Sequence, residues 1–146
     1  MKKLILFAFL AMAAVPKGNA ALFISNNTDC RVVVQIYAHD ITHGTCVLQS
    51  WRLVLEAWES ASYNNVASIN TDLGWLNGQT AATTGGTSVW GWDGAFFNGS
   101  GGGGVGYPGT CFTTTTLTVP NTCLPVANVT ATWGPLGSNT ILEFNP

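Results

Sequence analysis

Six tryptophans are the residues of this 146-residue sequence best suited to binding a ligand. A flat indole stacks on the apolar face of a sugar ring, while nearby amide, carboxylate and hydroxyl groups bond the sugar hydroxyls. We therefore predict an aromatic binding face made of Trp75, Trp90, Trp92, Asp93, Asn98 and Tyr107. Burial is the open alternative for these residues. A sandwich core takes up one or two tryptophans, and Trp51 and Trp133 suit that role.

The histidines and loop acids are weaker candidates for a metal site. Two imidazoles and a carboxylate in the run from His39 to His43 could ligate a divalent ion, but the run falls in a connection between strands with no further partner evident. Asp72 and Asp93, each with an asparagine nearby, offer the oxygen ligands that calcium prefers, without the spacing of an EF-hand. Turn-stabilising side chains explain these acids more simply. We predict no metal and no cofactor, and leave loop calcium open.

Catalytic motifs are weak or incomplete. Glu56 and Glu59 are three residues apart, which places them on opposite faces of a strand rather than as a hydrolytic pair. No G-x-S-x-G elbow is present. The glycines of residues 101–106 spell G-x-G-x-x-G, but Tyr107-Pro108 follows, so no helix can begin there to receive a phosphate. We predict that the chain is not an enzyme and that residues 98–109 form an irregular loop.

The charge of the chain excludes several classes of partner. After residue 20 there is no lysine, and two arginines stand against seven acids, which gives a net charge of about −5. Nucleic acids and anionic membranes are bound chiefly through lysine and arginine. We predict that neither is a partner.

The first twenty residues are typical of a secretory signal peptide. Lys2 and Lys3 precede an apolar run over residues 4–15, and small residues at 18 and 20 favour cleavage before Ala21. The run is shorter than the ~20 residues that span a bilayer. We predict export to the extracellular space or the cell surface, with the periplasm possible.

Four cysteines follow the predicted leader, an even number that favours disulfides in an exported chain. Three connectivities are possible. We favour the one in which both bonds close short loops, Cys30–Cys46 with Cys111–Cys123. Zinc is disfavoured because no Cys-x-x-Cys is present.

The elements that must position these residues are strands. Apolar residues alternate with polar ones from Leu22 to Ile36, and residues 129–133 and 140–144 flank a turn as a hairpin. A further strand is expected over residues 87–92, with Trp90 and Trp92 on one face. About eight short strands predict one all-β domain over residues 21–146, an antiparallel two-sheet sandwich of immunoglobulin-like type. A jelly roll or a small barrel is the fallback.

Together these features predict an exported, non-catalytic recognition module. Its partner would be a neutral polysaccharide or an extracellular protein, bound through the aromatic face. The alternative is a structural subunit of a surface layer or fibre, in which low charge and exposed strand edges favour self-association.

Overall fold

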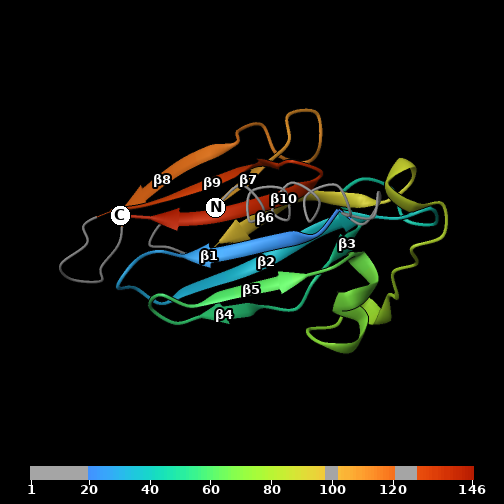
Figure 1. The fold of residues 1–146 in the computed structure, drawn as a ribbon, viewed down its shortest axis with the longest axis horizontal. Helices are drawn as coiled ribbons and strands as arrows, with labels where there is room; N and C mark the ends of the chain where they lie inside the picture. Colours follow the sequence, from blue (N-terminus) through green and yellow to red (C-terminus); the bar gives the residue numbers. More distant parts are fainter. Residues whose placement is uncertain (1–19, 98–101, 121–127) are drawn as a thin grey trace, which may run out of the picture.

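The described residues, 20–97, 102–120 and 128–146 of a computed structural model, form two packed sheets (Figure 1). The predicted leader over residues 1–20 lies outside them except for Ala20. The first sheet has the order β5 (Ser60–Tyr63), β1 (Leu22–Asn26), β10 (Asn139–Asn145), β9 (Asn128–Leu136) and β8 (Thr116–Pro120). The second has the order β3 (Leu48–Gln49), β2 (Val32–His39), β6 (Gly91–Phe97) and β7 (Gly103–Gly106), with β4 (Leu53–Leu55) also paired to β2.

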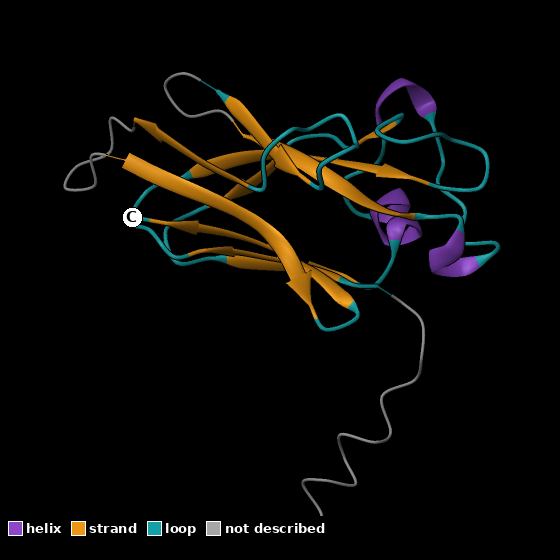
Figure 2. Cartoon of the chain, turned by 90° about the horizontal axis from the view of Figure 1, so that it is seen from above, coloured by secondary structure: helices purple, strands orange, loops and turns teal. Residues whose placement is uncertain are grey.

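Three short 3-10 helices lie in the connection between β5 and β6, at one end of the two layers (Figure 2). They are η1 (Val66–Thr71), η2 (Leu76–Gly78) and η3 (Gly86–Ser88). No helix in the described ranges has the length and apolar character needed to cross a bilayer.

The core lies between the sheets and follows from the period-2 pattern of the strands. Every second residue of β2 is buried from Val32 to Ala38, and β10 buries Leu142 and Phe144. Phe97 of the second sheet meets Phe144 of the first edge to face, with ring centroids 5.3 Å apart. The predicted all-β two-sheet sandwich is confirmed, while its immunoglobulin-like subtype stays a prediction.

One pair of strands departs from the antiparallel arrangement. β1 runs parallel to β10, with Leu22 opposite Thr140 and Asn26 opposite Phe144, and antiparallel to β5. No hairpin joins β1 to β10, which are far apart in the sequence, so no turn forces them to be antiparallel.

Two predicted element boundaries are wrong. The strand predicted over residues 87–92 begins only at Gly91, where β6 starts, because Gly85 and Gly86 adopt positive φ as the N-cap and first residue of η3. Residues 98–109 are not wholly irregular, because β7 (Gly103–Gly106) pairs with β6. Glycine richness predicts an irregular loop here, whereas the structure uses the glycines of β7 for close packing.

The glycines of β6 and β7 make room for one aromatic ring on the outer face of the second sheet. A Cβ placed on Gly94, Gly104 or Gly106 would overlap the ring of Phe112. Tyr37 meets that ring edge to face, with centroids 5.2 Å apart. The absence of side chains on these strands therefore seats Phe112 against the backbone.

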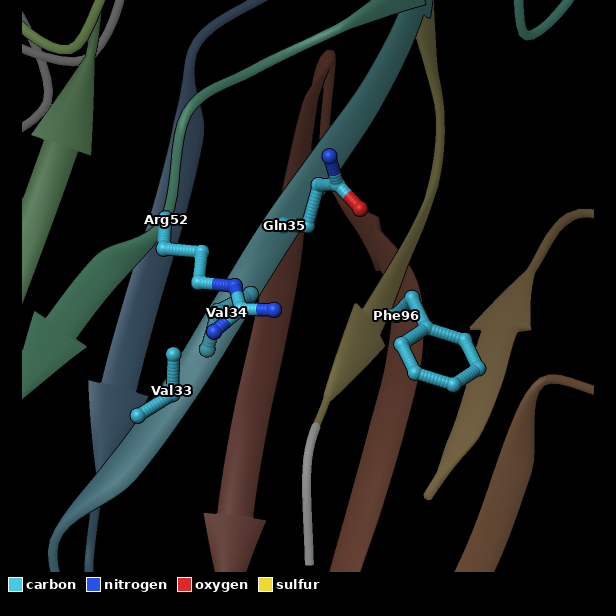
Figure 3. A pocket seen from close by; sticks show the side chains of 5 residues that line it. All are labelled: Val33, Val34, Gln35, Arg52 and Phe96. Carbon is cyan, nitrogen blue, oxygen red and sulfur yellow. The ribbon is translucent and has the colours of Figure 1, made fainter.

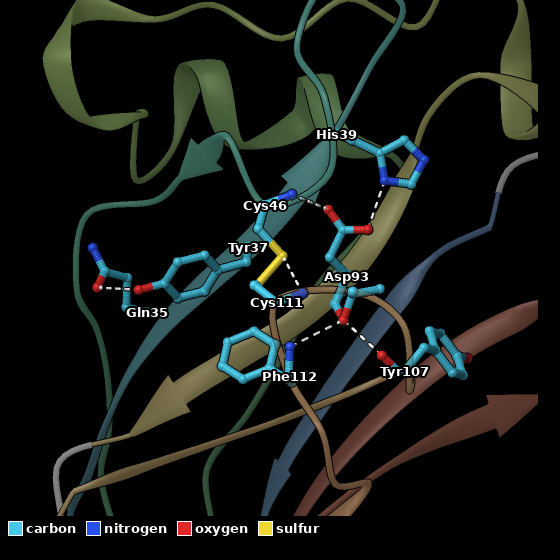
Figure 4. Close-up of a disulfide and its surroundings, with 9 residues drawn as sticks. Gln35, Tyr37, His39, Cys46, Asp93, Tyr107, Cys111 and Phe112 are labelled. Atoms are coloured by element: carbon cyan, nitrogen blue, oxygen red, sulfur yellow. Dashed lines mark hydrogen bonds and ion pairs between the residues drawn. A yellow bond between two sulfur atoms is a disulfide. The ribbon is translucent and has the colours of Figure 1, made fainter.

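A disulfide holds the segment that carries Phe112. Cys46 is bonded to Cys111, so the predicted pairs Cys30–Cys46 and Cys111–Cys123 are both wrong (Figure 4). Short loop length favoured the local pairs, but the sandwich brings the β2–β3 connection beside the segment after β7 and joins cysteines 65 residues apart. Cys30 is also disulfide-bonded, and Cys123 lies outside the described residues.

Candidate functional site

Three tryptophans of the predicted aromatic face are buried. Trp75, Trp90 and Trp92 are exposed by only 3%, 1% and 4%. The Nε1 of Trp75 donates to Asn70 Oδ1 and that of Trp92 donates to the carbonyl of Ala20, each at 2.8 Å. An enclosed indole has no free face for a sugar ring, so these three tryptophans cannot form the predicted binding face.

The β5–β6 connection explains how the core holds so many tryptophans. Trp75 and Trp90 belong to that connection, which also buries Val66 and Ile69 beyond the end of the sheets. Trp92 points inward from β6 and lies against Tyr63. The core is therefore larger than two sheet faces alone would provide.

The other members of the predicted face do not form a surface either. Asp93 is buried, and its carboxylate accepts hydrogen bonds from His39 Nδ1 at 2.6 Å and from the Cys46 amide at 2.7 Å (Figure 4). Tyr107 is half-buried and meets Trp133 edge to face. Asn98 lies outside the described residues.

The exposed tryptophans are Trp51 and Trp58, at 58% and 65%, among the residues that the structure describes. The sequence favours the core for Trp51, but the structure places it on the surface. Alternation counted back from Leu53 and Leu55, on the inner face of β4, places Trp51 inside, and a β-bulge at residues 50–52 breaks that alternation. Tyr37 pairs with Gln49 and Val34 pairs with Leu53, so three residues, 50–52, lie opposite only two on β2. The extra residue shifts the alternation and turns Trp51 and Arg52 toward solvent.

Ser50 stabilises this bulge from inside the sandwich. Its side chain is buried, its Oγ accepts the Ile36 amide at 2.9 Å, and the same hydroxyl donates to the Trp51 carbonyl at 2.7 Å. The Trp51 amide donates to the carbonyl of Gly74 at 3.0 Å. Since the backbone on both sides of Trp51 is bonded, its indole extends from a fixed position.

The bulge opens onto a groove over the outer face of the second sheet. One hollow of about 490 Å³ is lined by Gln35, Trp51, Arg52 and Leu76. A smaller hollow of about 100 Å³ is lined in part by Val33, Gln35, Arg52 and Phe96 (Figure 3). The two share Gln35 and Arg52. We call their combined lining, apart from the buried Val34, the Arg52 groove: Val33, Gln35, Trp51, Arg52, Leu76 and Phe96.

Gln35 is the fixed polar group of the Arg52 groove. Its Nε2 donates to the Ser50 carbonyl at 3.0 Å, and its Oε1 accepts the Tyr37 hydroxyl at 3.3 Å. These bonds set the orientation of the amide and leave one N–H and one oxygen lone pair for a ligand. Burial raises the pKa of Tyr37, so its hydroxyl keeps the proton that it donates.

Arg52 is the charged group of the same groove. In the described part of the chain its guanidinium has no ion pair and no hydrogen bond, and no carboxylate lines either hollow. Arg31, by contrast, lies 3.4 Å from Glu56. The groove therefore combines an exposed indole, an oriented amide and an uncompensated positive charge.

The two histidines form separate pairs with buried acids. His39 donates to Asp93, and His43 Nδ1 lies 2.9 Å from Asp40 Oδ1. Among the described residues no cluster of three potential metal ligands is found, and no hydroxyl or thiol bonds the His39 ring. Asp93 instead fixes Cys46, whose φ of 61° places its backbone in the left-handed region.

A phase shift in the sequence could have indicated the bulge and the groove. Leu48 and Ser50 point inward, so strict alternation would bury Arg52, although Leu53 and Leu55 are the next apolar residues on the inner face. Because an arginine without a partner is rarely buried, an extra residue between Ser50 and Leu53 is the simplest way to place Arg52 outside and Leu53 inside.

Searches among known protein families, curated proteins and solved structures returned no match to this chain. The assignment of a function therefore depends on the geometry of the groove.

Proposed function

We propose that this chain is an exported, non-catalytic recognition module that binds carbohydrate in the Arg52 groove. The observation that carries the proposal is the exposed indole of Trp51, held by a bonded backbone beside a hollow of about 490 Å³. That volume falls within the roughly 300–1,000 Å³ of small-ligand sites.

The polar and apolar parts of the groove suit a sugar. Trp51 and Leu76 provide apolar surface for the face of a pyranose ring. The oriented amide of Gln35 has a donor and an acceptor left for hydroxyl groups. The described lining contains no imidazole or carboxylate that could act as a general acid or base, which favours binding over catalysis.

The compartment is part of the proposal. The signal-like residues 1–20 predict export, and the Cys46–Cys111 disulfide is of a kind that persists in oxidising surroundings. A polysaccharide outside the cell is therefore a ligand that the protein could meet.

Affinity electrophoresis of the oxidised protein through gels containing different polysaccharides tests this function. We expect at least one polymer to retard the parent protein and Trp51→Ala to bind it roughly tenfold or more weakly, a change of about 1.4 kcal/mol. Trp58→Ala is the matched control. Its indole is equally accessible but bonds Asp29 outside the groove.

Equal retardation of Trp51→Ala and the parent would remove the groove from the binding site. If no polymer retards the parent, binding of an extracellular protein or self-assembly becomes the better-supported function. Sedimentation of the same sample then distinguishes these two, because assembly requires a species larger than the monomer.

A further inference from the structure

We infer that the saccharide recognised in the Arg52 groove carries a carboxylate, as a hexuronic acid does, and that Arg52 binds it. This inference rests on the proposed function and specifies the class of sugar. The sequence predicts a neutral ligand because stacking on an indole needs no net charge, whereas the groove carries a positive charge of its own.

Arg52 is exposed and has no partner in the described ranges. Figure 3 shows its side chain extending from the segment before β4 across β2, between Val33 and Gln35, toward the strand that carries Phe96. A guanidinium in this position has its planar fork of N–H donors available, and a carboxylate accepts two of them side by side.

The distribution of charge makes Arg52 unusual in this chain. After residue 20 it is one of two arginines in a stretch without lysine, and the other, Arg31, is beside Glu56. The net charge of about −5 does not prevent an acidic ligand from approaching. At physiological salt, exposed charges are screened beyond about 8 Å, so the charge nearest the bound group dominates.

The neighbours of Arg52 favour an acidic sugar over a peptide carboxyl terminus. Trp51 presents a flat apolar surface, and the adjoining Gln35 amide suits ring hydroxyls. A bound peptide would ordinarily add to a regular strand edge, but residues 50–52 are bulged, and their amides at 50 and 51 already bond Ile36 and Gly74.

Calorimetric titration with trigalacturonic acid and with its methyl ester isolates the carboxylate. The two probes have the same rings and hydroxyls, and the ester replaces each carboxylate by an uncharged methyl ester. We expect the parent protein to bind the acid roughly tenfold more tightly than the ester, and Arg52→Gln to bind both with the affinity of the ester. Added sodium chloride should weaken binding of the acid but not of the ester.

Arg31→Gln is the matched control and should behave as the parent, while thermal melting establishes that each variant is folded.

Equal affinity of the parent for acid and ester, with both lost in Trp51→Ala, would overturn the carboxylate assignment and leave the proposed function intact. Failure of every saccharide to bind would remove both proposals. An unrelated peptide with a free carboxyl terminus is compared in the same way with its C-terminal amide. If the free peptide bound more tightly than the amide and the uronate did not bind, the groove would be assigned to the carboxyl termini of proteins instead.

Discussion

At the scale of single residues, the buried acids organise loops. Asp40 follows the end of β2, and its Oδ1 accepts the amides of Thr42 and His43 at 2.8 and 2.7 Å. Its Oδ2 accepts the Ala82 amide at 2.7 Å, which ties two loops together. Burial raises the pKa of Asp40, but the hydrogen bonds from Ala82, Thr42 and His43 outweigh it and hold this pKa well below its usual range.

Asp40→Asn should therefore destabilise the protein in a pH-dependent way. Because the pKa is lower in the folded state, the stabilisation from Asp40 is present above its unfolded pKa of about 3.9 and is lost as the pH falls below that value. We expect Asp40→Asn to lower the free energy of unfolding by about 1–3 kcal/mol at pH 7. Urea unfolding measured from pH 7 to pH 2.5 should show this difference shrinking below pH 4.

Glu143→Gln provides the control for that experiment, since the Glu143 side chain has no hydrogen bond or ion pair among the described residues. A difference between Asp40→Asn and the parent that is constant over the whole pH range would show that charge is not the cause.

At the scale of elements, the glycine-rich β7 is a packing surface. Gly106 has no room for a Cβ, because the Asp93 carbonyl, the Phe112 ring and the Gly94 Cα surround that position. Gly106→Ala should destabilise the protein by about 1–3 kcal/mol through overpacking. Gly134→Ala on β9 places its methyl group in open space and should change stability by less than about 0.5 kcal/mol. Urea unfolding under non-reducing conditions compares the two, and equal losses would contradict the packing role of β7.

The strands were more predictable than the side-chain directions at the site. Alternation identified β1, β2 and the β9–β10 hairpin, since one face of each strand is buried. It failed at Trp51 because counting back from Leu53 and Leu55 misses the extra residue of the bulge, which Ser50 holds through a bond to the neighbouring strand β2. The tryptophan content indicates that the fold must accommodate several large rings. The space that buries Trp90 is provided by the β5–β6 connection, which no local sequence pattern reveals.

At the scale of the whole molecule, the Cys46–Cys111 disulfide links two distant parts of the second sheet. It joins the β2–β3 connection to the segment that presents Phe112, on the sheet whose outer face carries the Arg52 groove. The Cys111 amide also donates to Cys46 Sγ at 3.2 Å, and the Cys46 amide donates to Asp93. The bond therefore closes a loop that contains β3, β4, β5, the β5–β6 connection, β6 and β7.

The size of that loop predicts a large loss on removing the bond. A closed loop of 65 residues restricts the unfolded chain enough to contribute about 4 kcal/mol in the chain-entropy description. We expect the double variant Cys46→Ser/Cys111→Ser to lose most of this in urea unfolding. Peptide mapping of the unreduced parent should recover Cys46 linked to Cys111. A Cys30–Cys46 peptide would contradict the pairing, since it would require the β2–β3 connection to leave the segment that carries Phe112.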